Sequence, residues 1–239
     1  MNRNALPYAI GAILLGIVGI VFHEFALQWQ QVPAGVPRIP YAYVSAAILL
    51  LAGCALLVRR YERIGALTLT VFYAIWVVFF HLPVAFASWK HIGAWNGPAE
   101  ITLLTMGGLA LWSAAAGPAR NMLRLISRVL AGACAIVFGL AHFNYIDFTA
   151  TFVPGWIPPN QAFWAWATGA GHLAAGLALV SGLQARLAAA CLAGMMGSFV
   201  LLVHIPRVFN APGEHMEWVM VSVATALSGA VWLVRKYST

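Results

Sequence analysis

Seven histidines and six acidic residues carry most of the chemistry available to this chain. His23, His81, His142 and His204 fall near the ends of apolar runs, and His172 lies inside one. An imidazole can exchange protons near neutral pH, hydrogen-bond a quinone oxygen, or ligate a metal or haem iron. A nearby carboxylate orients the imidazole or takes its proton. The candidates for a ligand or proton site are therefore His23, Glu24, His81, Glu100, His142, His172, His204 and Glu214.

Each candidate also has a structural interpretation. A histidine at the end of a membrane helix lies at the headgroup level, where polarity costs little. Glu100 and Glu214 follow Pro98 and Pro212, and a carboxylate in the first turn of a helix complements the helix dipole. The depth of His172 makes it the best single candidate inside a bundle. The sequence defines no catalytic residue, and the candidates for a metal site are His23, His142, His172 and His204.

The composition assigns the chain to the membrane. Its 239 residues are 62% hydrophobic and only 8% charged, whereas soluble domains carry roughly a quarter charged residues. The net charge of +7 therefore reflects loops that set topology, and no nucleic-acid partner is expected. His23-Glu24 lacks the second histidine of a zinc hydrolase motif, no phosphate-binding loop is present, and the three cysteines form no CxxC pair.

Continuous apolar runs predict an all-α membrane protein with about eight transmembrane helices. Each run is close to the roughly 20 residues that cross a bilayer. The first run is interpreted as a retained helix and not as a signal peptide. The predicted spans are 7–29, 41–58, 64–87, 98–116, 121–146, 160–181, 186–206 and 216–234.

The basic residues predict the topology. Ten of the thirteen Lys and Arg residues fall on one side of the alternating loops, and Arg38, Lys90 and Arg207 fall on the other. The positive-inside rule then places both termini in the cytoplasm. Most of the candidate histidines and carboxylates fall on the opposite, outer side.

An internal repeat divides the chain into two four-helix units, residues 1–118 and 119–239, which form one bundle. Residues 41–83 align without gaps on 164–206, at a constant offset of 123. In this alignment His81-Leu-Pro83 matches His204-Ile-Pro206, and His172 matches Leu49. Because each unit has an even number of helices, the two units are expected to have the same orientation.

Outside the gapless region the predicted matches need small gaps. They pair His23 with His142 and Glu100 with Glu214. Pro83 and Pro206 are expected to end their helices. Small residues spaced by four, Gly171/Ala175 and Gly194/Ser198, are expected to permit close helix contacts.

The second half resembles a known family. It contains Ala141-His-Phe-Asn-Tyr145, Phe152-Val-Pro-Gly-Trp-Ile-Pro158, Thr168-Gly-Ala-Gly-His-Leu-Ala-Ala-Gly176 and Leu201-Leu-Val-His-Ile-Pro206. This run resembles the DoxX-like family of bacterial four-helix membrane proteins, and the first half resembles it more weakly. The family is associated with membrane subunits of thiosulfate:quinone oxidoreductases and with redox-stress systems. The resemblance implies a membrane redox role for the chain, in the inner membrane of a bacterial cell with the outer side facing the periplasm.

Three functions follow as alternatives. The first is a quinone-linked oxidoreductase or oxidoreductase subunit with a His/Glu-lined periplasmic site, using quinone or haem and a periplasmic or membrane redox partner. The second is a carrier or binding protein for a small lipophilic ligand or a metal. The third is a structural or assembly subunit without catalysis. All three share membrane lipid as the surrounding solvent.

Overall fold

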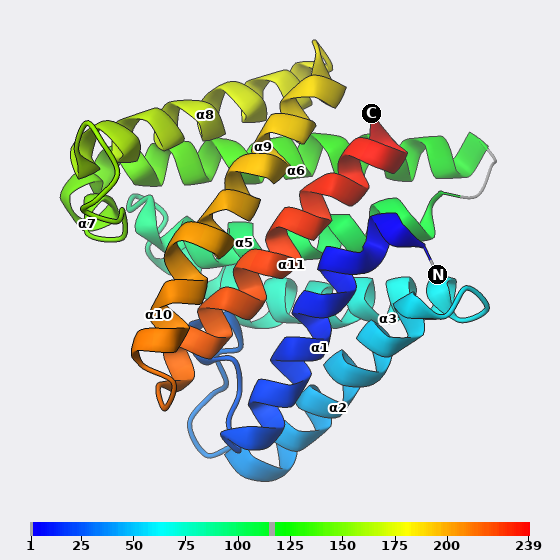
Figure 1. Ribbon diagram of the computed structural model, residues 1–239. Helices are drawn as coiled ribbons and strands as arrows, with labels where there is room; N and C mark the ends of the chain where they lie inside the picture. Colours follow the sequence, from blue (N-terminus) through cyan, green and yellow to red (C-terminus); the bar gives the residue numbers. More distant parts are fainter. Residues whose placement is uncertain (1, 115–117) are drawn as a thin grey trace.

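The described residues, 2–114 and 118–239 of a computed structural model, form a helical bundle (Figure 1). In the first half the helices are η1 (Arg3–Ala5), α1 (Leu6–Val21), η2 (Leu27–Trp29), α2 (Arg38–Leu57), α3 (Glu62–Ile75), the π-helical turn η3 (Trp76–His81), α4 (Leu82–Ala87) and α5 (Gly93–Trp112). In the second half they are α6 (Pro118–Asn144), α7 (Ile146–Ala150), α8 (Gln161–Ser181), α9 (Ala185–Phe199), the π-helical turn η4 (Val200–His204), α10 (Ile205–Asn210) and α11 (His215–Ser238).

Within the described ranges, seven helices are long and apolar enough to cross a membrane. The remaining predicted span, 98–116, corresponds to α5, which is 20 residues long but carries Asn96, Pro98 and Glu100 in its first half. These three residues lower its apolar character. The surface of the bundle is rich in exposed large apolar side chains, such as Leu51 and Phe79, as expected for helices that contact lipid.

The packing of the helices is reciprocal between the two halves. The first long helix of each half packs on the last long helix of the other, α1 against α11 and α6 against α5. Helices α5 and α11 also pack against each other. In α5, Leu103 and Leu104 are almost fully buried, and in α11 so are Val231 and Leu233. The core therefore lies along the contact between these two helices.

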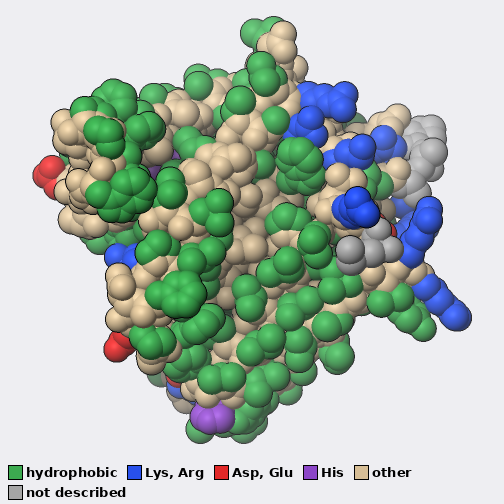
Figure 2. Space-filling model, viewed as in Figure 1, with side chains coloured by type: hydrophobic (Ala, Val, Ile, Leu, Met, Phe, Trp, Pro, Cys, Tyr) green, Lys and Arg blue, Asp and Glu red, His purple; other side chains and the backbone are tan. Residues whose placement is uncertain are grey.

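Both termini lie at the same end of the bundle. The side-chain amide of Asn2 donates to Glu62 Oε1 at 2.6 Å and to the Tyr237 hydroxyl at 2.8 Å. Most of the Lys and Arg side chains visible in Figure 2 lie on the side where Figure 1 places the termini. The predicted division at residues 118/119 falls at the start of α6.

Two predicted spans differ most from the structure in their boundaries. The first was expected over 7–29, but α1 ends at Val21 and His23 adopts a left-handed conformation with φ of 56°. This conformation is unfavourable within a right-handed helix, and the chain turns back so that Phe25 and Trp29 are buried in the bundle. The span expected over 98–116 begins earlier, at Gly93, and residues 115–116 lie outside the described residues.

Pro83 and Pro206 do not end their helices. In each half a π-helical turn, η3 or η4, ends at the histidine two residues before the proline, and helix continues to Ala87 or Asn210. A proline removes one backbone donor and clashes with the preceding turn, and a wider π-type turn within the helix accommodates such a disturbance. The expectation that the helices stop at Pro83 and Pro206 was wrong.

Close helix contacts follow the offset of 123. The backbone of Gly53 is so close to α1 that a Cβ would lie 3.0 Å from the Ala9 carbonyl and the Ile13 nitrogen. A Cβ on Gly176 would lie 2.7 Å from the Gly132 carbonyl and 2.8 Å from the Ile136 nitrogen. Since 9, 13 and 53 become 132, 136 and 176 on adding 123, α1/α2 and α6/α8 pack in the same register.

The expected small-residue contacts are only partly correct. A Cβ added at Gly194 would meet open space, and one added at Gly171 would meet only the flexible side chain of Met195. The residues that bring backbones together in this half are instead Gly132, Gly139 and Gly176. Spacing alone identified small residues but not the helix face that contacts a neighbour.

Candidate functional site

A cavity of about 740 Å³ lies in the second half, at the end of the bundle away from the termini. Its walls come from the start of α5, the end of α6 with α7, the start of α8, and α9 with η4. Most of the lining is apolar or aromatic, including Phe152, Phe199 and Leu202. The polar side chains on its wall include Asn96, Glu100, His142, Thr168, Ser198 and His204.

His142 and His172 form a pair beside this cavity. Their ring centroids are 5.0 Å apart, and His172 is only 2% exposed between Phe138 and Phe199. Nδ1 of His142 lies 2.8 Å from the Phe138 carbonyl, so it carries the proton and donates. The remaining nitrogen, Nε2, therefore keeps its lone pair in the neutral ring. Nδ1 of His172 is buried with no partner among the described residues.

His204 reaches the cavity from the last residue of η4. Its Nδ1 is also buried without a partner in the described part of the chain. Close by in sequence, Arg207 forms a two-pronged ion pair with Glu217, at 2.6 and 2.8 Å. Arg207 is the only basic residue of α10, and its guanidinium is engaged by Glu217.

Glu100 brings a carboxyl group to the cavity wall from the first half of the chain. One oxygen accepts a hydrogen bond from the Trp29 indole, and the other accepts from Asn96 Nδ2 at 3.0 Å. The expected position in the first turn was wrong, because α5 begins at Gly93 and Glu100 follows about two turns later. Glu100 therefore contributes to the cavity and not to capping.

The other candidates lie outside the cavity. His23 is exposed and its Nδ1 hydrogen-bonds the Tyr43 hydroxyl. Glu24 pairs with Arg38, and this guanidinium lowers the pKa of the carboxyl. His81 is buried in the first half, with Nε2 3.1 Å from the Trp29 carbonyl. Glu214 is exposed at the start of α11.

The structure also corrects two of the predicted symmetric pairs. In the register set by the glycine contacts, His142 corresponds to Gly19, and His23 to Ile146. Trp95 and Trp218 are 123 residues apart, and the indole of each donates to the carbonyl six residues upstream. The offset of 123 therefore extends to α5 and α11. In that register Glu100 corresponds to Val223. Of the three cavity-side histidines, only His204 has a histidine counterpart, His81.

The four metal candidates do not meet. His142 and His172 are adjacent and His204 lies on the same cavity, whereas His23 lies in the other half. In residues 2–114 and 118–239, no group of three or more His, Cys, Asp or Glu side chains is arranged to hold a metal ion.

Sequence reasoning missed the residues that complete the cavity. Trp29, which holds Glu100, was not among the candidate residues, and neither were Phe199, Ser198 and Met195. The sequence did contain a signal that could have separated the candidates, namely the gapless offset of 123. When this offset is extended to the first and last helices of each half, His142 is no longer paired with His23.

Comparison with known families gives one match. Residues 123–205 match the family model DoxX. This segment is DoxX-like. The DoxX-like segment runs from α6 to the start of α10, and it contains His142, His172 and His204 but not Glu100. With the apolar helices, it identifies the chain as an integral membrane protein. No curated protein and no solved structure matches the chain.

Proposed function

We propose that this integral membrane protein binds a quinone in the cavity of its second half and takes part in quinone-linked redox chemistry. The observation that carries the proposal is the cavity of about 740 Å³, whose largely apolar wall presents His142, His204 and Glu100. Ligand sites of this size are typically apolar with a few polar groups that fix orientation.

The polar groups suit a quinone. A quinone has a flat apolar ring, an apolar tail and carbonyl oxygens that accept hydrogen bonds, and on reduction it takes up two electrons and two protons. The buried nitrogens of His172 and His204 lack partners in the described chain, which is costly unless a ligand supplies one. His142, held by the Phe138 carbonyl, has a fixed tautomer and orientation, as a proton-exchanging imidazole requires.

Glu100 is proposed as the second proton-exchanging group. It faces the same cavity as His204 but belongs to α5 of the other half. Asn96 and Trp29 fix its two oxygens. The chain's own residues would thus orient the ring and exchange protons, while the electron donor is a separate partner.

The proposal is tested by titrating the purified protein in detergent with a short-tailed ubiquinone and following tryptophan fluorescence. Saturable binding is expected, and His142→Leu and His204→Leu should each weaken it about tenfold, the effect of one hydrogen bond. His23→Leu, outside the cavity, is the matched control and should bind as the wild type does. No saturable binding by the wild-type protein, or equal binding by all variants, would overturn the proposal.

The same preparation separates quinone redox chemistry from simple binding. Reduction of the bound quinone by a membrane fraction or a sulfur-compound donor, lost in Glu100→Gln, supports a redox role. Saturable binding without reduction by any donor would favour the alternative of a binding or carrier protein.

We further propose that the chain crosses a bacterial inner membrane eight times, as two parallel four-helix repeats with both termini in the cytoplasm. The reciprocal packing of α1 on α11 and α6 on α5 supports a two-fold relation between the halves. The termini lie together, on the side that carries most of the visible basic side chains. Epitope tags at both ends should resist external protease in spheroplasts, and digestion of either would contradict the topology.

A further inference from the structure

In the first half, the place that corresponds to the cavity is filled, because the chain between α1 and α2 folds into the bundle there. Phe25, Ala26, Trp29 and Gln30 of this connection are each less than 8% exposed. We call residues 25–30 the inner segment. The corresponding connection of the second half contributes Phe148, Thr149 and Phe152 to the cavity wall without filling the cavity.

The inner segment occupies the place that corresponds to the cavity. Gln30 Nε2 donates to Ser45 Oγ at 2.7 Å, the Phe25 ring meets Trp76, and the Trp29 carbonyl bonds His81. Adding 123 to the numbers of these three contacted residues gives Thr168, Phe199 and His204, and all three line the cavity.

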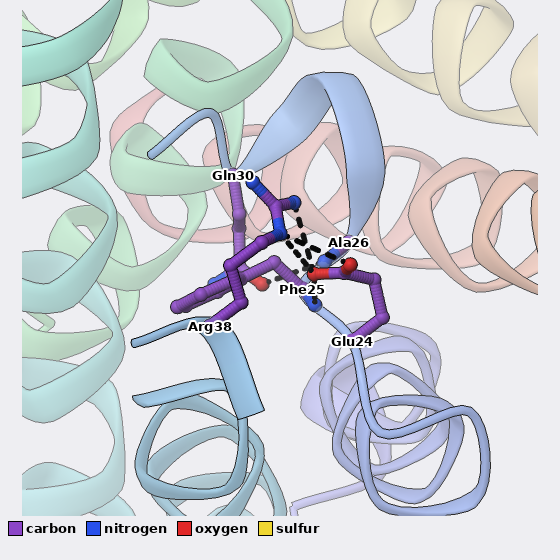
Figure 3. Close-up of polar contacts among 5 residues, drawn as sticks. All are labelled: Glu24, Phe25, Ala26, Gln30 and Arg38. Carbon is purple, nitrogen blue, oxygen red and sulfur yellow. Dashed lines mark hydrogen bonds and ion pairs between the residues drawn. The ribbon is translucent and has the colours of Figure 1, made fainter. Parts of the chain in front are cut away.

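Local bonds hold the inner segment in this position (Figure 3). Gln30 Oε1 accepts from the Ala26 nitrogen at 3.0 Å, and Glu24 accepts from the Phe25 nitrogen at 2.8 Å. Arg38, at the start of α2, bonds both oxygens of Glu24. The segment is therefore held where it enters the bundle by Glu24 and Arg38. Hydrogen bonds from side chains satisfy its buried Phe25 and Ala26 nitrogens, as burial of backbone requires.

We propose that the first half contains a second aromatic-ligand site, closed by the protein's own Trp29. The occupant is a planar apolar ring with one N–H donor, and that donor bonds Glu100. The site's natural ligand class is thus an indole. In the wild-type chain the cavity of the second half stays open, and the same Trp29 bond orients Glu100 on its wall.

The test removes the Trp29 ring by substitution and then adds indole as a free molecule. Trp29→Ala should bind indole, because a buried cavity of matching shape accepts the missing ring. At millimolar indole the thermal midpoint of Trp29→Ala should rise by about 3 °C, by ligand linkage. Trp29→Phe, which keeps a ring in the site, and Trp156→Ala, which removes an exposed indole of the other half, should show no more change than the wild type.

The proposal is independent of quinone binding, because indole and not quinone is the probe. Equal indole responses of Trp29→Ala and wild type would overturn it while leaving the quinone cavity untouched. If Trp29→Ala is too unstable to purify, the yield of monodisperse protein is measured from cells grown with and without indole. A severalfold recovery of yield with indole supports the site, and no recovery overturns it.

Discussion

At the scale of single residues, two histidines with almost the same burial have different surroundings. His81 is 3% exposed and its Nε2 bonds the Trp29 carbonyl, whereas His172 is 2% exposed and its Nδ1 has no partner in the described chain. In the register of 123 residues, His172 stands where the first half has Leu49. The first half thus shows that an apolar side chain fits this place in the fold.

This difference predicts opposite effects of the same substitution. His81→Leu should lower the free energy of unfolding by about 1–3 kcal/mol, because it leaves the Trp29 carbonyl without its partner. His172→Leu should change it by less than about 1 kcal/mol or raise it, because it removes an unpaired buried nitrogen. Thermal unfolding of both variants in one detergent checks this. A larger loss in His172→Leu than in His81→Leu would contradict the assignment of partners.

The Glu24–Arg38 pair predicts a pH dependence outside the membrane helices. Arg38 lowers the pKa of Glu24 below its ordinary 4.5, so the pair stabilises the fold above pH 4.5 and this contribution disappears as pH falls through the lowered value. The midpoint of wild type should exceed that of Glu24→Gln by about 1–2 °C at pH 7, since exposed pairs contribute little. The two midpoints should converge in acid, and a gap that widens on acidification would refute the pairing.

At the scale of helices, the tight contacts depend on glycine where backbones cross. Gly176 lies against the Gly132 carbonyl of α6, whereas Gly194 on α9 faces open space. Both glycines are within helices, but only Gly194 was expected from its spacing to permit a close helix contact. Their surroundings therefore decide what an added methyl group does.

Gly176→Ala should destabilise the protein by about 1–3 kcal/mol, because its Cβ would lie 2.7 Å from a backbone carbonyl that cannot move aside easily. Gly194→Ala should be neutral or stabilising by up to about 1 kcal/mol, because alanine favours helix and nothing is displaced. Unfolding midpoints of the two variants give the comparison. Equal destabilisation would mean that the α6/α8 crossing is less tight than the structure has it.

At the scale of the whole molecule, each half depends on the other for its core. Helix α1 packs on α11 and α6 on α5, while α5 and α11 meet at the centre. Glu100 of the first half also completes the cavity of the second. The two halves are therefore expected to form one cooperative bundle and not two independent domains.

Fragments 1–114 and 118–239, expressed together, should co-purify at equal stoichiometry, because their association buries the apolar faces of α5 and α11. Either fragment expressed alone should be degraded or aggregate. Affinity purification through a tag on one fragment measures this. A stable, monodisperse second fragment with saturable quinone binding would show that α5 and Glu100 are dispensable.

The sequence by itself determined the helical membrane character, the approximate spans and the DoxX-like segment. These depend on local composition and on short motifs, such as the apolar runs and His204-Ile-Pro206, that can be read without knowing which helices touch. It also identified His142, His172, His204 and Glu100 among its eight candidates. It could not separate these from His23, Glu24, His81 and Glu214.

Only the tertiary structure decided which candidates meet, because a contact depends on how two helices are aligned and on the path of the chain between them. The close glycine crossings set the register that places His142 opposite His172. The left-handed turn at His23 sends Trp29 inward to Glu100, which fills one half and leaves the other open. Apolar runs of the same composition can take either path, so the difference between the two halves arises from long-range packing.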